Sequence, residues 1–257
     1  MRVAIIQAPN GLLPGSEEWR VLAQQIRDEK PEVLITNEMP FGPWLAESNT
    51  YEAALAAKSI ALHEEGLVAL RALQIPVVLS SRPVPAGDRL ANEAFALAGG
   101  EYIFGHHKHY FPAEPGFFET EWFQAGKPGF HSVEAGALRA GFLLCTELFF
   151  NEWAREYRRQ DANLIAVPRA SGESVEKWLP AAKMAAIVSG CHVASSNRVG
   201  RVSDDLTFGG RGFCIAPDGS LIGETSPQQP VFVFDLDPAV SKRQQQEYPC
   251  YVKELSI

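Results

Sequence analysis

Glu38, Lys108 and Cys145 each stand at or just after the end of a short apolar run in the sequence. Such runs predict strands, and α/β proteins place their active sites at the carboxyl ends of strands. A thiol at that place gains from nearby backbone N–H groups, which favour the thiolate and can hold an oxyanion. The pattern therefore makes Cys145 a candidate nucleophile.

Each of these residues also has an ordinary structural interpretation. Free cysteine is mostly buried and inert, so Cys145 could simply fill space in the core. Glu38 is either a solvated carboxylate at a strand end or a general base. Lys108 lies in the run His106-His107-Lys108-His109, which indicates a metal site or a solvated basic turn. Neighbouring histidines on a strand point to opposite faces, which favours the basic turn.

Taken together, the residues form a more specific pattern. Glu, Lys and Cys follow one another at intervals of 70 and 37 residues, and this order resembles the nitrilase superfamily of carbon–nitrogen hydrolases over nearly the whole chain. The segments that carry the resemblance are Val3-Ala-Ile-Ile-Gln-Ala, Asn37-Glu38-Met-Pro, Lys108-His-Tyr-Phe-Pro112, Gly141-Phe-Leu-Leu-Cys145-Thr-Glu147 with Phe150 and Glu152, Val167-Pro-Arg-Ala, Trp178 with the helix to Gly190, Ser196-Asn197-Arg198 and 212–219.

The resemblance implies covalent catalysis on a carbon–nitrogen bond. An amide carbon is a poor electrophile, and a thiolate is the strongest nucleophile available near neutral pH. The family pattern implies that Cys145 is the nucleophile, that Glu38 is the general base and acid, and that Lys108 stabilises the oxyanion. It makes the backbone N–H of Thr146 a second oxyanion donor. It implies no metal and no organic cofactor.

The family often carries a further glutamate after the lysine motif. Glu114 and Glu119 are the two candidates here. The segment 112–123 resembles the carbamoylputrescine amidase branch, in which a Pro-Gly-aromatic turn leads into the glutamate, and this favours Glu119. Its implied role is to position Lys108 and the substrate amine. The alternative for either glutamate is a loop carboxylate in water.

Four aromatic residues near these motifs could make an apolar acyl pocket, and packing in the core or at a dimer contact is an equally good explanation for any one of them. They are Phe41, Trp44, Phe149 and Trp178. Leu148 and Phe149 occupy the positions at which carbamoyl amino acid hydrolases carry a carboxylate-binding Arg. Thr146 replaces the Trp that follows the cysteine in many nitrilases, which favours an amidase.

The surrounding elements predict a mixed α/β fold, because some strands are separated by helices and others by tight turns such as Gly99-Gly100. Strands are predicted over 3–8, 33–36, 77–80, 92–97, 102–106, 130–133, 138–144, 164–167, 192–196, 212–216, 221–223 and 231–235, and helices over 16–30, 51–73 with a break near Gly66, 151–159 and 175–189. The resemblance implies a four-layer α-β-β-α sandwich. It also implies a homodimer, or a higher homo-oligomer, that pairs around the helix 151–159.

Composition limits the remaining possibilities. The chain of 257 residues is 46% apolar, which excludes a disordered chain and suits one domain over residues 1–257. The net charge of −8 argues against binding to nucleic acid or to an anionic membrane. No apolar run approaches the ~20 residues of a membrane-spanning helix. Cys145, Cys191, Cys214 and Cys250 form no CxxC pair, which predicts reduced thiols in a cytoplasmic protein, the last three being structural.

Several function classes remain open. The leading hypothesis is a cysteine-dependent amidase that acts on a small amide or carbamoyl amine. A nitrilase would use the same residues on a nitrile. A non-catalytic scaffold of the same fold is a third class, although it would need none of Glu38, Lys108 and Cys145. An acyltransferase would share the acyl-enzyme but usually needs added segments.

Overall fold

The computed structural model describes residues 1–126 and 129–253, so residues 127–128 and 254–257 of the predicted domain lie outside the described ranges. Its elements are β1 (Arg2–Pro9), α1 (Glu17–Asp28), β2 (Val33–Ile35), η1 (Leu45–Glu47), α2 (Ala53–Arg71), β3 (Val77–Ala86), β4 (Arg89–Ala98), β5 (Glu101–His107), β6 (Ala113–Glu114), β7 (Phe117–Phe118), α3 (Glu119–Trp122), β8 (Val133–Ala135), β9 (Leu138–Phe142), η2 (Cys145–Phe149), α4 (Asn151–Arg159), β10 (Leu164–Arg169), α5 (Trp178–Ser189), β11 (His192–Arg201), β12 (Thr207–Gly209), β13 (Phe213–Ile215), β14 (Leu221–Glu224), β15 (Val231–Asp235) and α6 (Pro238–Gln244).

Strand β1 joins two groups of strands into one continuous ladder. The order of the main path is β5-β4-β3-β2-β1-β11-β10-β9-β8. The first part of β1 pairs in parallel with β2 over Val3–Ile5 and antiparallel with β15 over Arg2–Ile6. Its last part, Gln7–Pro9, pairs in parallel with β11. The two halves of the ladder can therefore face each other while they share this one strand.

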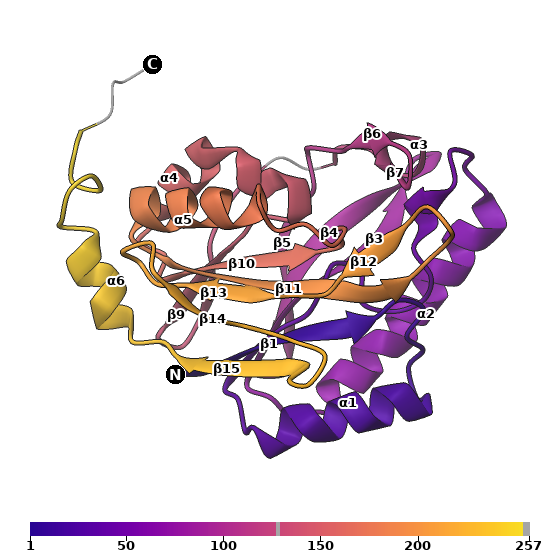
Figure 1. Cartoon of the computed structure of the whole chain (residues 1–257), viewed down its shortest axis with the longest axis horizontal. Coiled ribbons are helices and arrows are strands. Elements are labelled where there is room, and N and C mark those ends of the chain that lie inside the picture. Colours follow the sequence, from indigo (N-terminus) through magenta and orange to yellow (C-terminus); the bar gives the residue numbers. More distant parts are fainter. Residues whose placement is uncertain (127–128, 254–257) are drawn as a thin grey trace.

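Alternation along the strands builds the layers, because successive side chains of a strand point to opposite faces. Val3 and Ile5 of β1 are buried in a core with residues of both halves of the ladder, including Ala140 of β9 and Leu164 of β10. Other strand residues pack against the helices on the outside. Figure 1 shows α1 and α2 on one outer side and α4 and α5 on the other. The α-β-β-α arrangement is thereby confirmed.

Helix α2 runs through Gly66 without interruption, so the predicted break there is wrong. A Cβ atom at Gly66 would lie 2.2 Å from the ring of Phe41. Because Gly66 has no side chain, the segment after β2 can pack closely against the helix. This tertiary packing outweighs the ~1 kcal/mol of stability that glycine costs inside a helix.

Strand β3 also departs from the prediction, because it continues past Ser80 and Pro83 to Ala86. Its pairing with β2 covers only Val77–Leu79, whereas its pairing with β4 continues to the end of the strand. Proline lacks an N–H and is tolerated where one edge of a strand has no partner. The long hairpin extends β4 and carries Asn92 to the carboxyl end of β2.

Two further segments differ from the predicted pattern. The proline-rich stretch after Lys108, predicted as a loop, contains the short hairpin of β6 and β7 and the single helical turn α3. The strand predicted over 130–133 is instead β8, which begins at Val133. Among the described residues, no helix is long and apolar enough to cross a membrane.

Candidate active site

Glu38, Lys108 and Cys145 converge at the carboxyl ends of strands. Glu38 follows β2, Lys108 follows β5 and Cys145 follows β9. Glu38 and Lys108 are 0% exposed and Cys145 is 3% exposed. The interpretation of Lys108 as part of a solvated basic turn is therefore wrong. It is buried because two carboxylates surround its ammonium group.

Lys108 bridges the two glutamates. Its Nζ donates to Glu38 Oε1 at 2.8 Å and to Glu119 Oε2 at 2.7 Å. Asn92 Nδ2 donates to the same Glu38 Oε1 at 2.8 Å. Glu38 Oε2 and Glu119 Oε1 have no hydrogen-bonding partner among the described residues. Each carboxyl group therefore keeps one oxygen available for a proton or for substrate.

Burial and neighbouring charges set the ionisation of this cluster. Burial alone lowers the pKa of Lys108, but Glu119 and Glu38 outweigh it, and the pKa lies above its ordinary value. Burial raises the pKa of Glu119 to about 8, against the attraction of Lys108 and with the repulsion of Glu38. The cluster therefore favours the protonated form of Lys108, and burial favours the neutral form of Glu119.

Cys145 begins the turn η2 in an unusual backbone conformation. Its φ of 48° lies in the left-handed region, which non-glycine residues adopt at a cost in free energy and which is frequent at functional sites. Its Sγ donates to the carbonyl oxygen of Ala170 at 3.7 Å. Burial, followed by the charge of Glu38, raises the pKa of the Cys145 thiol. The thiol is thus protonated near neutral pH, and a role as nucleophile would require a base beside it.

Glu147 ties the cysteine turn to the lysine segment. Its Oε2 accepts a hydrogen bond from the Leu144 N–H at 2.8 Å and lies 2.7 Å from His106 Nε2. Its Oε1 accepts a hydrogen bond from the His109 N–H at 2.9 Å. The sequence places Glu147 two residues after Cys145, within the motif that carries the resemblance, but it indicates no role for this residue. Its partners on the lysine segment were not visible, because they are distant in sequence.

Arg198 holds the turn that follows Glu38. Its Nε donates to the Glu38 carbonyl oxygen at 3.2 Å and its Nη1 donates to the Gly42 carbonyl oxygen at 3.0 Å. Its Nη2 donates to the carbonyl oxygen of Met39, whose φ of 42° is also left-handed. Arg198 belongs to a segment that carries the family resemblance, but the sequence alone assigned it no role. Its contacts with three carbonyl groups show that it holds the turn after Glu38.

A cavity of about 140 Å³ opens beside the cysteine. Its lining residues are Pro112, Glu114, Phe117, Glu119, Cys145, Thr146, Ala170, Ser171, Gly172 and Trp178. Both candidate glutamates thus reach the cavity, but Glu119 is buried against Lys108 whereas Glu114 is exposed. Of the predicted pocket residues, Thr146 and Trp178 line the cavity.

The other predicted aromatic residues lie outside this lining. Phe41 packs edge-on against Trp19 on the side of α1, with ring centroids 5.2 Å apart. Trp44 packs against Phe208, with centroids 5.8 Å apart. Phe149 is 40% exposed and contacts the ring of Trp178 from outside the cavity, with centroids 4.8 Å apart. These three side chains therefore pack against other aromatic rings of the fold and are not among the residues that line the cavity beside Cys145.

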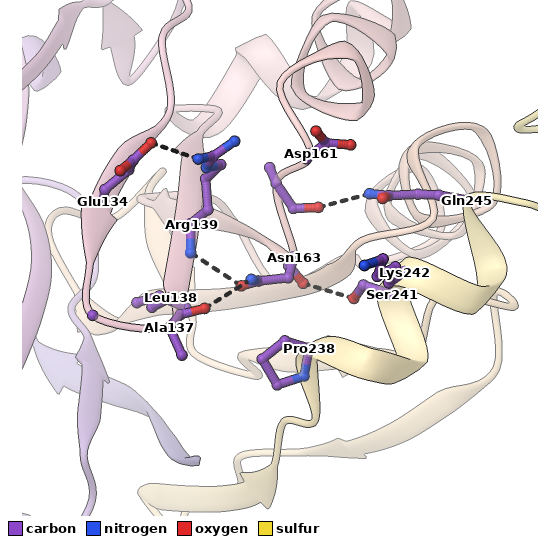
Figure 2. Close-up of a pocket in the computed structure, with 12 residues that line it drawn as sticks. Glu134, Ala137, Leu138, Arg139, Asp161, Asn163, Pro238, Ser241, Lys242 and Gln245 are labelled. Carbon is purple, nitrogen blue, oxygen red and sulfur yellow. Dashed lines mark hydrogen bonds and ion pairs between the residues drawn. The ribbon is translucent and has the colours of Figure 1, made fainter.

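A larger cavity, of about 370 Å³, lies at the opposite ends of β9 and β10 (Figure 2). Its lining includes Leu138, the first residue of β9, and Asn163, which precedes β10. Helix α6 closes one side of it, where Ser241 Oγ donates to the Asn163 carbonyl oxygen at 3.1 Å and Gln245 Nε2 donates to the Ala162 carbonyl oxygen at 2.8 Å. The cavity contains none of the candidate catalytic residues and marks the junction at which α6 docks.

The histidines near Lys108 point to separate partners. His106 Nε2 faces Glu147, whereas His107 Nε2 lies 3.2 Å from Glu93 Oε2. Within residues 1–126 and 129–253, no group of three or more His, Cys, Asp or Glu side chains is arranged to hold a metal ion.

Known proteins share both sequence and fold with this chain. The family model described as carbon–nitrogen hydrolase matches residues 2–245. The N-carbamoylputrescine amidase of Arabidopsis thaliana is 27% identical over 165 residues, which are 57% of this chain and 55% of that protein. A nitrilase of Pyrococcus abyssi is 29% identical over 162 residues, or 61% of this chain and 58% of that protein. The chain thus aligns with little more than half the length of these curated relatives.

Solved structures extend the similarity to almost the whole fold. A carbon–nitrogen hydrolase from Helicobacter pylori G27 matches with a TM-score of 0.83 and 20% identity, covering 97% of this chain and 94% of that one. An amidase from Nesterenkonia sp. matches with a TM-score of 0.77 and 21% identity, covering 94% and 92%. At such identities, the likeness establishes the shared fold.

Proposed function

The chain belongs to the carbon–nitrogen hydrolase family, and from this premise we propose that it is a cysteine-dependent amidase that hydrolyses a small amide or carbamoyl amine. The observation that carries the proposal is the buried Glu38–Lys108–Glu119 cluster beside a cavity that Cys145 also lines. The products are an acid and ammonia or an amine.

In the proposed first step, Glu38 takes the proton of the Cys145 thiol while sulfur attacks the carbonyl carbon of the substrate. The carbonyl π electrons move to oxygen and form an oxyanion. An ammonium group has three N–H bonds, and Lys108 uses two of them on Glu38 and Glu119. The third, together with the Thr146 N–H, is available to the oxyanion.

In the second step, the tetrahedral intermediate collapses. The carbon–nitrogen bond breaks, its electron pair goes to nitrogen, and Glu38 returns its proton to the leaving amine. Glu38 then removes a proton from water, which attacks the thioester, and the acid leaves as the Cys145 thiol is restored. Once Glu38 has taken the thiol proton, and with Glu119 neutral, Lys108 carries the only charge of the cluster, so the cluster attracts the negative charge of the oxyanion.

The decisive measurement is ammonia release from a panel of amides, carbamoyl amines and nitriles. We expect release from the first two classes and its loss in Glu38→Gln. One equivalent of iodoacetamide should label Cys145 first and abolish turnover, and Cys250→Ser is the matched control that should remain active and remain sensitive. Release from nitriles alone would identify a nitrilase, and no release by folded protein would favour a scaffold.

We also propose that two copies pair through the α4–α5 layer, as the family resemblance implies. Phe149 is 40% exposed and Met184 of α5 is 47% exposed on this layer, and exposed apolar side chains often mark interfaces. Light scattering of the protein as it leaves a size-exclusion column should give twice the mass of the chain, and Met184→Glu should lower this mass.

The four cysteines are free and buried, which supports a cytoplasmic location.

A further inference from the structure

A buried arginine lies behind one wall of the catalytic cavity. Arg169 is 0% exposed, and its guanidinium lies between two aromatic rings, 5.0 Å from the centroid of Trp178 and 4.9 Å from that of Phe213. It forms no ion pair with any residue that the structure describes. Burial lowers its pKa to about 10, so the group remains charged near neutral pH. An unpaired buried charge is costly, which makes its presence informative.

The hydrogen bonds of this guanidinium go to neutral oxygens. Nη2 donates to the Arg211 carbonyl oxygen at 2.9 Å and Nε donates to Ser195 Oγ at 3.3 Å. Nη1 donates to Ser171 Oγ at 3.0 Å. Ser171 lines the cavity together with Cys145. Since Ser171 Oγ already accepts from Arg169, its hydrogen is left to donate, and it donates to no other described residue.

The backbone fixes this hydroxyl group relative to the nucleophile. The Ser171 N–H donates to Asn197 Oδ1 at 2.9 Å, and the Ser171 carbonyl oxygen accepts from Asn197 Nδ2 at 3.2 Å. Ser171 is 5% exposed. The preceding residue, Ala170, accepts the hydrogen bond from Cys145 Sγ. Because Cys145 and Ser171 line the same cavity, a group bonded to that sulfur shares the cavity with the Ser171 side chain.

We propose that the Ser171 hydroxyl, held and polarised by Arg169, donates a hydrogen bond to an oxygen atom in the acyl part of the substrate. The acyl part is the part that remains on Cys145 as the thioester, so this inference rests on the proposed function. A hydroxyl that accepts from a cation is a stronger donor than an isolated one. Ser171 thereby selects an acyl group that carries an acceptor near the scissile carbonyl.

The size of the cavity limits the acyl group further. Its volume of about 140 Å³ is below half of the ~300 Å³ at which sites for drug-sized ligands begin. The substrate class is therefore a short aliphatic amide with an ether, hydroxyl or carbonyl oxygen within a few atoms of the amide carbon.

Matched amides test this inference with the full chain. Methoxyacetamide and butyramide have the same chain length, and an oxygen in the first replaces a methylene in the second. A second pair, 3-methoxypropionamide and pentanamide, places the oxygen one atom farther out. For each pair, the ratio of kcat/KM between ether and alkane is measured in the wild type and in Ser171→Ala. The inductive effect of the ether is common to both enzymes and cancels when the two ratios are compared.

We expect the wild type to prefer at least one ether, and Ser171→Ala to reduce that preference roughly tenfold, as for a lost hydrogen bond to a buried partner. Ser171→Thr keeps the hydroxyl and should keep the preference. The exposed Ser174 provides the control, because Ser174→Ala should leave the ratio unchanged.

Two results would overturn the inference while leaving the proposed function intact. One is an ether-to-alkane ratio of kcat/KM that Ser171→Ala leaves unchanged, and an equal fall of both rates would then indicate a purely structural role. The other is a wild type that prefers neither ether over its matched alkane. Failure of the wild type to hydrolyse any amide would instead overturn the proposed function, and this inference with it.

Discussion

Glu119→Gln should change how the stability of the protein depends on pH. In the folded protein the pKa of Glu119 is raised by burial to about 8, from an ordinary value of 4.5. The carboxyl group lies 2.7 Å from Lys108 Nζ. Glutamine mimics the neutral acid, and its amide oxygen can still accept the hydrogen bond from Lys108. The substitution therefore removes a titration and keeps a contact.

The sign follows from the raised pKa. The folded protein holds this proton more tightly than the unfolded chain, so the contribution to stability is fully present below pH 4.5 and is lost as the pH rises through 8. The difference between 8 and 4.5, at about 1.4 kcal/mol per pH unit, gives about 5 kcal/mol over the whole window. Between pH 5.5 and pH 7.5, the wild type should thus lose about 3 kcal/mol relative to Glu119→Gln.

Urea unfolding followed by tryptophan fluorescence measures this difference. The protein concentration is held constant, because association would shift the apparent stability. Glu121 is an exposed neighbour, and Glu121→Gln controls for the loss of a surface carboxylate. Stability curves of the wild type and Glu119→Gln that stay parallel from pH 5.5 to pH 7.5 would refute the reasoning. Parallel curves are the result expected for a Glu119 that is an ionised partner of Lys108, because neither the folded nor the unfolded state would then release a proton from this residue in that range.

Three further substitutions test other parts of the structure. Glu147→Gln should destabilise the fold by about 1–3 kcal/mol and slow iodoacetamide labelling of the cysteine, because one of its oxygens becomes a donor facing donors; unchanged unfolding and labelling would contradict this. Gly66→Ala should lower the Tm, since a clash with the Phe41 ring at 2.2 Å costs about 1–3 kcal/mol against a gain of about 1 kcal/mol in helix propensity. Arg198→Lys should lower kcat more than it raises KM, because one ammonium cannot replace a guanidinium that contacts three carbonyl groups; a change in KM alone would argue for a role in binding.

The placement of Glu38, Lys108 and Cys145 was predictable because it depends on local features. Each residue ends an apolar run, and the carboxyl ends of such strands meet at one side of the fold. The ion pair of Lys108 was not predictable from its own segment, where three histidines indicated a basic turn. Burial of a lysine needs carboxylates that come from elsewhere in the chain, 70 residues before it and 11 residues after it.

Residues that act through long-range contacts were the least predictable. Arg169 gave no signal beyond its place in a motif, because its partners are hydroxyl and carbonyl groups and two rings from other elements. Gly66 and Pro83 gave misleading signals. Each of these residue types disfavours regular structure locally. Gly66 is tolerated in α2 because the ring of Phe41 lies where a side chain would be. Pro83 is tolerated in β3 because the pairing with β2 ends before it.

The pairing of β1 has a consequence for the order in which the molecule folds. Among the strands that the structure describes, β1 is synthesised before all others, yet its partners β11 and β15 are among the last of them. Contacts of such high sequence separation form slowly, whereas the β3–β4 hairpin can close as soon as both of its strands exist. The nascent chain therefore contains Cys145 before it contains β11, whose Arg198 holds the turn after Glu38. Cys145 is thus synthesised early, whereas the contacts that position Glu38 form late.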